Sequence, residues 1–242
     1  MLRVTFTVFR GYLLLVNGAT ALLWLRVMIS IVNTYAQILG SSQAGFDIAW
    51  PAIRSSMLLA QTVSSVHECA HAATGIVKSS IPSTFLQNFA RLLVAWLVVD
   101  CDSHTRSAAE IIMCSAWATS EVGRYLYLTV STLRPKATPH VLLWLRYSLF
   151  LVCYPVGILA EFWLYHSVLP TLFSGQGCPM VLKAMDVFLL ADGGCAATAG
   201  PVLSYLVGLS ILAHILGVPM LFGRMMSQRR KKLGGGRREK AS

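Results

Sequence analysis

Long apolar runs dominate the hydrophobic pattern of this chain, and short polar segments separate them. A helix needs about 20 residues to cross the hydrocarbon core of a bilayer, and six runs approach or exceed that length. They are Gly11–Val32, Pro51–Val77, Thr84–Val99, Ala108–Leu133, Val141–Tyr165 and Cys195–Phe222. The pattern predicts an all-α fold, a polytopic membrane helix bundle with about six transmembrane helices.

The fifth run carries polar groups at a helical spacing. Tyr147, Tyr154 and Glu161 follow one another in steps of seven residues, and each step turns a helix by about 700°, close to two full turns. The three side chains are therefore predicted to share one stripe, with Arg146 beside its first member. A carboxyl group inside a lipid-spanning helix indicates a functional group that faces a protected interior. Gly157 on the same helix allows the close approach of another helix or of a ligand.

A structural interpretation of this stripe stays open beside the functional one. The two tyrosines could anchor helix packing through hydrogen bonds, and Glu161 could lie near the far membrane interface. The functional interpretation is that Tyr154 and Glu161 exchange protons with a substrate in a water-poor pocket.

Composition places the chain among integral membrane proteins. Its 242 residues are 55% hydrophobic and only 12% charged, whereas soluble domains carry about 25% charged residues. We expect one transmembrane bundle domain over residues 1–223 and a basic cytosolic tail, disordered, over residues 224–242. The net charge of +10 comes largely from this tail, so we do not expect nucleic-acid binding.

The distribution of basic residues predicts the orientation in the membrane. Cytoplasmic flanks are rich in Lys and Arg. With both termini cytosolic, the cytosolic segments hold Arg3, Arg10, Lys78, Arg134, Lys136 and the basic tail, whereas the opposite loops hold only Arg106 and Lys183. The bias supports an even number of spans, and the tail is suited to contact anionic lipid headgroups.

The fourth run contains a possible ion pair. Glu121 and Arg124 are three residues apart, and Glu121 and Tyr125 are four apart. Side chains at these spacings meet on one face of a helix. An internal pair of this kind carries charge in lipid, and a role in fixing helix register is favoured over direct catalysis.

The second run offers a competing chemistry. His67, Glu68 and His71 form an H-E-x-x-H pattern, which in zinc enzymes places two imidazoles on one helical face beside a general base. Asp192 could supply a third ligand, as in intramembrane zinc proteases. The alternative is that Glu68 and His71 belong to a polar pocket shared with the fifth run.

Two stretches of the sequence resemble the signature patterns of one protein family. The stretch RYSLFLVCYPVGILAE, Arg146–Glu161, resembles the signature R-Y-x-x-F-x-x-x-Y-P-x-G-x-x-x-E of the very-long-chain (3R)-3-hydroxyacyl-CoA dehydratases, also called protein-tyrosine-phosphatase-like membrane proteins. The stretch AWATSEVGRYLY, Ala116–Tyr127, resembles the family's pattern around A-W-x-x-x-E-x-x-R-Y. The resemblance covers most of the chain and is strongest over residues 115–165.

The resemblance implies an activity and a division of roles. It implies a hydro-lyase that removes water from a 3-hydroxyacyl-CoA, the third step of fatty-acid elongation, in the endoplasmic reticulum membrane. Tyr154 and Glu161 correspond to the family's catalytic pair. Supporting or substrate-binding roles fall to Tyr147, Arg146, Arg124, Glu121, Gly157, Glu68 and His71. No metal or redox cofactor is required, and other elongation-cycle membrane enzymes are the expected partners. A non-catalytic scaffold of an elongase complex is a further alternative.

Overall fold

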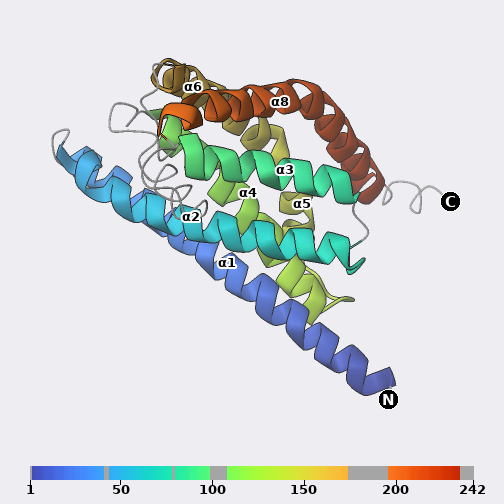
Figure 1. Cartoon of the computed structure of the whole chain (residues 1–242). Coiled ribbons are helices and arrows are strands. Elements are labelled where there is room, and N and C mark those ends of the chain that lie inside the picture. Colours follow the sequence, from blue (N-terminus) through green and yellow to red (C-terminus); the bar gives the residue numbers. More distant parts are fainter. Residues whose placement is uncertain (1, 41–43, 78–79, 99–107, 174–195, 235–242) are drawn as a thin grey trace. The chain divides into compact units, whose positions relative to one another are not determined.

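The computed structural model describes residues 2–40, 44–77, 80–98, 108–173 and 196–234, and within these ranges it contains helices and no strands. In chain order the helices are α1 (Leu2–Gly40), α2 (Ala44–Ala73), α3 (Ile81–Leu93), the π-helical turn η1 (Val94–Val98), α4 (Ala108–Leu133), α5 (His140–Ser148), α6 (Phe150–Phe173) and α8 (Ala196–Leu233). Figure 1 shows their course along the chain.

Each of the six predicted spans coincides with a helix over most of its length, and the prediction of an all-α membrane fold is confirmed. The fourth has the bounds of α4 itself, Ala108–Leu133. Among the described residues, three helical stretches are long and apolar enough to cross a membrane: Val8–Gln37, His140–Pro170 and Tyr205–Leu233. The remaining crossings rest on the apolar pattern of the sequence.

The described residues group into two compact units that interleave along the chain. Unit 1 draws on Met1–Ser56, Cys114–Gly157 and Pro219–Ser242, and unit 2 on Met57–Met113 and Ile158–Val218. Four helices, α2, α4, α6 and α8, contribute residues to both units. The single bundle domain expected over residues 1–223 stays a prediction.

Unit 1 is held together by contacts to α4. The Arg10 side chain of α1 donates from Nε to the Thr132 carbonyl at 2.9 Å and from Nη2 to the Leu133 carbonyl at 2.8 Å. These carbonyls end α4, where no further helical N–H is available to them. A Cβ added to Gly123 of α4 would lie 2.6 Å from Cδ1 at the end of the Leu149 side chain, so a larger residue there would require this leucine to shift.

Unit 2 contains a hairpin of α2 and α3. Gly75 adopts a φ of 72°, a left-handed conformation that glycine tolerates without strain, and it ends α2. The Val77 N–H then donates to the His71 carbonyl at 3.3 Å. Beyond the turn, the Trp96 Nε1 atom of η1 donates to Thr62 Oγ1 of α2 at 3.0 Å. The hairpin is therefore fixed at its turn and again near the end of the second arm.

The predicted fifth span is divided into two helices, which corrects the expectation that Tyr147 shares one helix with the rest of the stripe. The helix breaks at Leu149, whose carbonyl accepts from the Val152 N–H at 3.2 Å and from the Cys153 N–H at 2.9 Å. The first of these is a tighter bond than an α-helix makes. Pro155 lies six residues further on, has no amide hydrogen and crowds the carbonyl four residues before it, so it disturbs the first turns of α6.

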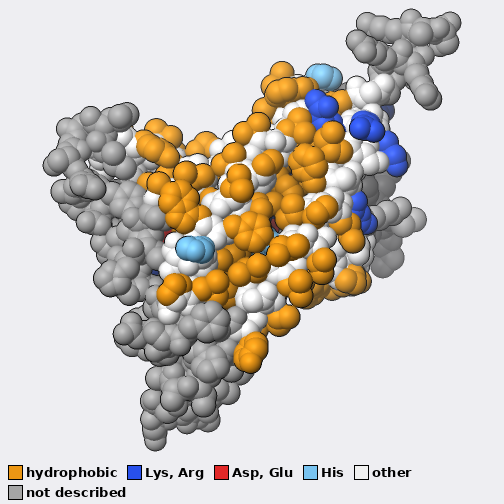
Figure 2. All heavy atoms as spheres, turned by 90° about the horizontal axis from the view of Figure 1, so that it is seen from above, with side chains coloured by type: hydrophobic (Ala, Val, Ile, Leu, Met, Phe, Trp, Pro, Cys, Tyr) orange, Lys and Arg blue, Asp and Glu red, His pale blue; other side chains and the backbone are white. Residues whose placement is uncertain are grey.

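Exposed apolar side chains cover much of the face that Figure 2 shows. Among the exposed residues are Leu15 of α1, Val152 and Leu159 of α6, and Leu209 and Leu216 of α8. Such a surface is unusual for a soluble monomer and suits contact with lipid. The protein is therefore membrane-embedded.

The basic segment after the last span begins as helix. The last turn of α8 holds Arg230, Lys231 and Lys232, and the helix ends at Leu233. Positive charge at a helix C-terminus is favourable because it opposes the helix dipole. The disorder expected from residue 224 therefore does not apply to the residues up to 233, and residues 235–242 lie outside the described ranges.

We predict that Arg10→Ala lowers the free energy of unfolding by about 1–2 kcal/mol, because two charge-assisted hydrogen bonds to α4 are lost. Thermal unfolding of the purified protein in detergent measures the change. Arg10→Lys keeps the charge but not the two-pronged geometry, so it should recover only part of the loss. Lys136→Ala, which removes an exposed basic residue beyond α4, is the control, and a melt of Arg10→Ala equal to that of this control would contradict the prediction.

Candidate active site

Tyr154 is a half-buried residue of α6 in unit 1. Its ring stacks on that of Phe222 of α8, with 6.1 Å between centroids and 24° between planes. Phe150 meets the same Phe222 edge-on at 5.6 Å. The stacking contact with Phe222 restrains the orientation of the Tyr154 ring.

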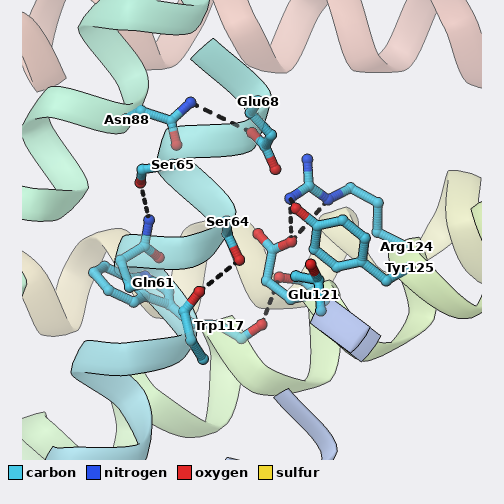
Figure 3. Close-up of polar contacts among 12 residues, drawn as sticks. Gln61, Ser64, Ser65, Glu68, Asn88, Trp117, Glu121, Arg124 and Tyr125 are labelled. Atoms are coloured by element: carbon cyan, nitrogen blue, oxygen red, sulfur yellow. Dashed lines mark hydrogen bonds and ion pairs between the residues drawn. The ribbon is translucent and has the colours of Figure 1, made fainter. Parts of the chain in front are cut away.

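The predicted ion pair of α4 forms, also in unit 1. Arg124 Nε donates to Glu121 Oε2 at 2.7 Å, and Nη2 contacts the same oxygen (Figure 3). Arg124 Nη2 also donates to the Tyr125 hydroxyl at 2.9 Å, and the guanidinium carbon lies 4.5 Å from the Tyr125 ring centroid. The Glu121 side chain is 6% exposed and that of Arg124 is 22% exposed. Arg124 is therefore partly exposed in unit 1, and the carboxylate of Glu121 balances its positive charge.

Arg146 and Tyr147, which the sequence assigns to the same supporting set as Glu121 and Arg124, lie on α5 in unit 1. The Arg146 guanidinium carbon is 5.7 Å from the Tyr147 ring centroid, and the Tyr147 ring meets Tyr127 of α4 edge-on at 6.3 Å. A guanidinium over an aromatic ring is held by cation–π attraction and keeps its donors free to point elsewhere. These residues supply a second positive group in unit 1.

Gly157 lies beside α4 within unit 1. A Cβ added there would lie 3.6 Å from Ala116 Cβ and 3.7 Å from Trp117 Cδ1. These are ordinary van der Waals distances, so helix packing has room for an alanine at this position. Packing against α4 alone therefore does not explain a glycine at 157.

Glu161 belongs to unit 2 and is 4% exposed. Its Oε2 atom lies 2.7 Å from Nε2 of His214, a residue of α8. His214 was not among the residues predicted from the sequence. The sequence does contain a signal for it. His214 is an ionisable residue in the apolar sixth run, and such a residue in a membrane span indicates a functional site, as Glu161 does in the fifth run.

A second polar contact joins the same two helices one turn along. The Tyr165 hydroxyl and Ser210 Oγ lie 2.6 Å apart, and both residues are buried. The Phe162 and Tyr165 rings meet the His214 ring edge-on, at centroid distances of 6.1 and 5.8 Å. The His214 imidazole is therefore in contact with two aromatic rings.

Glu68 and His71 lie on α2 in unit 2. Asn88 of α3 donates from Nδ2 to Glu68 Oε2 at 3.3 Å, as Figure 3 shows, and His71 is buried. The rings of His67 and His71 are 5.3 Å apart between centroids.

A metal site needs at least three ligands. Over the part of the chain that the structure describes, no three His, Cys, Asp or Glu side chains gather in this way. The proposed third zinc ligand, Asp192, lies outside the described residues.

Tyr154 and Glu161 are connected by continuous helix. α6 runs from Phe150 to Phe173 without a break, so the seven-residue step between them turns the helix through nearly two full turns and advances it by about 10 Å. Tyr154 belongs to unit 1 and Glu161 to unit 2, and the continuous helix α6 carries both.

The comparisons with known proteins define the family. The sequence profile of the protein tyrosine phosphatase-like protein family, PTPLA, matches residues 61–235, which is most of the chain. The chain belongs to this family. The resemblance predicted from the two signature stretches is thereby confirmed.

Curated relatives of this PTPLA-family chain carry one enzyme name. A very-long-chain (3R)-3-hydroxyacyl-CoA dehydratase of Caenorhabditis elegans, hpo-8, is 28% identical over 95% of this chain and 97% of its own length. The rice dehydratase PASTICCINO 2B is 29% identical, covering 93% of each chain. Human dehydratase 2 is 25% identical over 92% of this chain and 81% of its own length. No solved structure gives a significant match.

We predict that breaking the ion pair of this PTPLA-family protein destabilises it more than removing both partners does. Glu121→Leu leaves the Arg124 charge without its carboxylate and should lower the free energy of unfolding by about 3 kcal/mol. Adding Arg124→Met removes the remaining charge and should restore part of that loss. Thermal unfolding in detergent compares the two variants, and equal melting temperatures for them would contradict the prediction.

Proposed function

We propose that this chain is a very-long-chain (3R)-3-hydroxyacyl-CoA dehydratase, a hydro-lyase that gives trans-2-enoyl-CoA and water in the fatty-acid elongation cycle. The observation that carries the proposal is the shared name of relatives that align with nearly the whole chain, the worm protein over 95% of it. Both residues of the predicted catalytic pair, Tyr154 and Glu161, are present on one continuous helix.

The reaction needs two proton transfers. The thioester carbonyl acidifies the C2–H bond of the substrate, so a base can remove that proton. The electron pair of the C2–H bond becomes the C2–C3 double bond as the C3–O bond breaks. The departing hydroxyl leaves as water when an acid gives it a proton. One enzyme group gains a proton and another loses one, and the proton returns between them before the next turnover.

Tyr154 and Glu161 are our candidates for these two groups. The reaction needs one group to act as acid and one as base, and a phenol and a carboxyl group can each take either role. The stacking on Phe222 holds the Tyr154 ring, and the contact to His214 holds Glu161. Each group is therefore oriented before the substrate arrives, which is how positioned groups lower a reaction barrier.

The remaining predicted residues fit supporting roles. Guanidinium groups recognise phosphates through several donors, so Arg124 and Arg146 are suited to the CoA moiety, with Glu121 and Tyr147 orienting them. Gly157 would admit the substrate beside α6, since packing against α4 does not demand a glycine. On α2, Glu68 and His71 would complete a polar lining in unit 2.

The membrane setting suits a substrate with two unlike parts. A long acyl chain is compatible with the apolar interior, and a charged CoA head requires an aqueous entrance, which we place on the cytosolic side. We further propose that the protein resides in the endoplasmic reticulum with both termini cytosolic, and that it associates with other membrane enzymes of the elongation cycle. The basic end of α8 supports this orientation.

We predict that the purified protein converts a 3-hydroxyacyl-CoA with an acyl chain of about 16–20 carbons, long enough to reach across much of one leaflet, into the enoyl-CoA. Tyr154→Phe and Glu161→Gln each remove one proton-transferring group and should lower kcat by at least about 100-fold. Chromatographic measurement of the enoyl-CoA product gives the rates. Absence of product from the wild-type protein, where a known dehydratase is active, would refute the proposed function.

Tyr205→Phe is the matched control for the phenol, because Tyr205 is a 77% exposed residue of α8. This variant should retain wild-type turnover. Circular dichroism and the elution volume in detergent test whether the two catalytic variants still fold. Near-normal turnover in either one would remove that residue from the mechanism.

The zinc-protease and scaffold alternatives have direct tests. Elemental analysis of the purified protein should find far less than one zinc per chain, whereas stoichiometric zinc that disappears in His67→Ala and His71→Ala would favour a protease. A scaffold would give inactive protein whose loss still disrupts an elongase complex. Product formation by the isolated wild-type chain would argue against both.

A further inference from the structure

His214 occupies a defined place in unit 2, where α6 and α8 run antiparallel and in register. Glu161 contacts His214, and Tyr165, four residues later, contacts Ser210, four residues earlier. The two contacts are one helical turn apart on each helix. The pairing of Tyr165 with Ser210 therefore fixes the level at which Glu161 meets the imidazole.

The backbone of α8 determines which nitrogen of the ring carries a proton. His214 Nδ1 lies 2.6 Å from the Ser210 carbonyl oxygen. A carbonyl oxygen only accepts hydrogen bonds, so Nδ1 must donate and must be protonated. The other nitrogen, Nε2, is thereby the one presented to Glu161.

The contact between Nε2 and Glu161 requires a single shared proton. At 2.7 Å the two atoms are at hydrogen-bond distance, and such a bond needs one hydrogen between them. That hydrogen belongs either to an imidazolium facing a carboxylate or to a carboxylic acid facing a neutral imidazole. Both forms leave the pair with no net charge, which is the condition a buried site in a membrane protein favours.

We propose that His214 is a positioning residue, which holds Glu161 by its Oε2 atom and shares one proton with it. This inference rests on the proposed dehydratase function and adds a residue to it. Engagement of Oε2 by His214 restricts the rotation of the carboxyl group. Glu161 then meets the substrate in one orientation rather than in several.

Neighbouring side chains restrain the imidazole ring of His214. The Phe162 and Tyr165 rings stand edge-on to it, and the His214 side chain is 11% exposed. A ring restrained by aromatic contacts and by a backbone hydrogen bond loses little freedom when it binds a carboxyl group. A residue that positions a reacting group must itself be held in one rotamer, and these contacts hold His214 in that way.

Three substitutions at this position separate positioning from packing. His214→Phe keeps a ring and removes both nitrogens. His214→Gln places an amide donor near the position of Nε2, and His214→Asn places one near that of Nδ1 only. His166→Phe is the matched control, because His166 is an exposed residue of α6 that lies close to Glu161 in sequence.

We expect His214→Phe to lower kcat on the order of 100-fold while KM stays within about threefold, as misplacement of a reacting group does. His214→Gln should recover most of the turnover, within about tenfold of wild type, and His214→Asn should not. His166→Phe should behave as wild type. A folded His214→Phe variant with wild-type kcat would overturn the inference, and so would equal turnover of the Gln and Asn variants.

A spectroscopic measurement tests the pairing without turnover and applies even if the Phe variant does not fold. The ring ¹⁵N resonances of the six histidines are recorded in the full-length protein, and those of His214 are assigned by their absence in His214→Gln. We expect a protonated Nδ1, and an Nε2 resonance that moves in Glu161→Gln. Resonances of His214 that are insensitive to Glu161→Gln would refute the pairing.

The two proposals fail in different ways. A wild-type protein that forms no enoyl-CoA refutes the dehydratase function, while the ¹⁵N measurement still decides whether Glu161 and His214 share a proton. An active wild type with an equally active His214→Phe variant refutes only the role of His214.

Discussion

A carboxyl group among lipid-facing helices must find a partner inside its own fold, because water is not at hand to solvate it. Two buried carboxyl groups of this protein meet the requirement in different ways. Glu121 is held within α4 by Arg124, so its partner comes from the same helix. Glu161 is held by His214 from another helix, so its partner also fixes how α6 and α8 pair. The contact of Glu161 with His214 therefore constrains how two helices pack, whereas the contact of Glu121 with Arg124 constrains only side chains on one face of α4.

The helical fold could be predicted well because a membrane simplifies the sequence pattern. α4 was located to its end residues, since Leu133 is followed by a basic residue and a proline, both typical of a helix end at a cytosolic interface. α1 and α8 were predicted too short. Apolar runs mark only the part of a helix inside the hydrocarbon, and both helices continue beyond it. The break at Leu149 was missed because its neighbours are apolar and helix-compatible, and Pro155 indicates a disturbance without locating it.

The candidate site was predictable where the partner lies nearby in sequence. The spacing of Glu121 and Arg124 predicts their contact, because neighbours on a helix face follow from its period. The contact of Glu161 with His214 spans 53 residues, and no local periodicity encodes such a pairing. The substrate class came from the family signature, since side-chain spacing by itself specifies neither an acyl chain nor a thioester.

The attachment of Arg10 to the end of α4 has a consequence for biosynthesis. Its acceptors, Thr132 and Leu133, follow it by 122 and 123 residues. At elongation rates of about 5–20 residues per second, roughly 6–25 s pass before the ribosome has made them. With the N-terminus cytosolic, as we propose, the guanidinium is during that interval a positive charge that favours this orientation of the first helix in the bilayer. On this proposal the same group acts first as a topology signal and later, once α4 has been inserted, joins α1 to α4 by two hydrogen bonds.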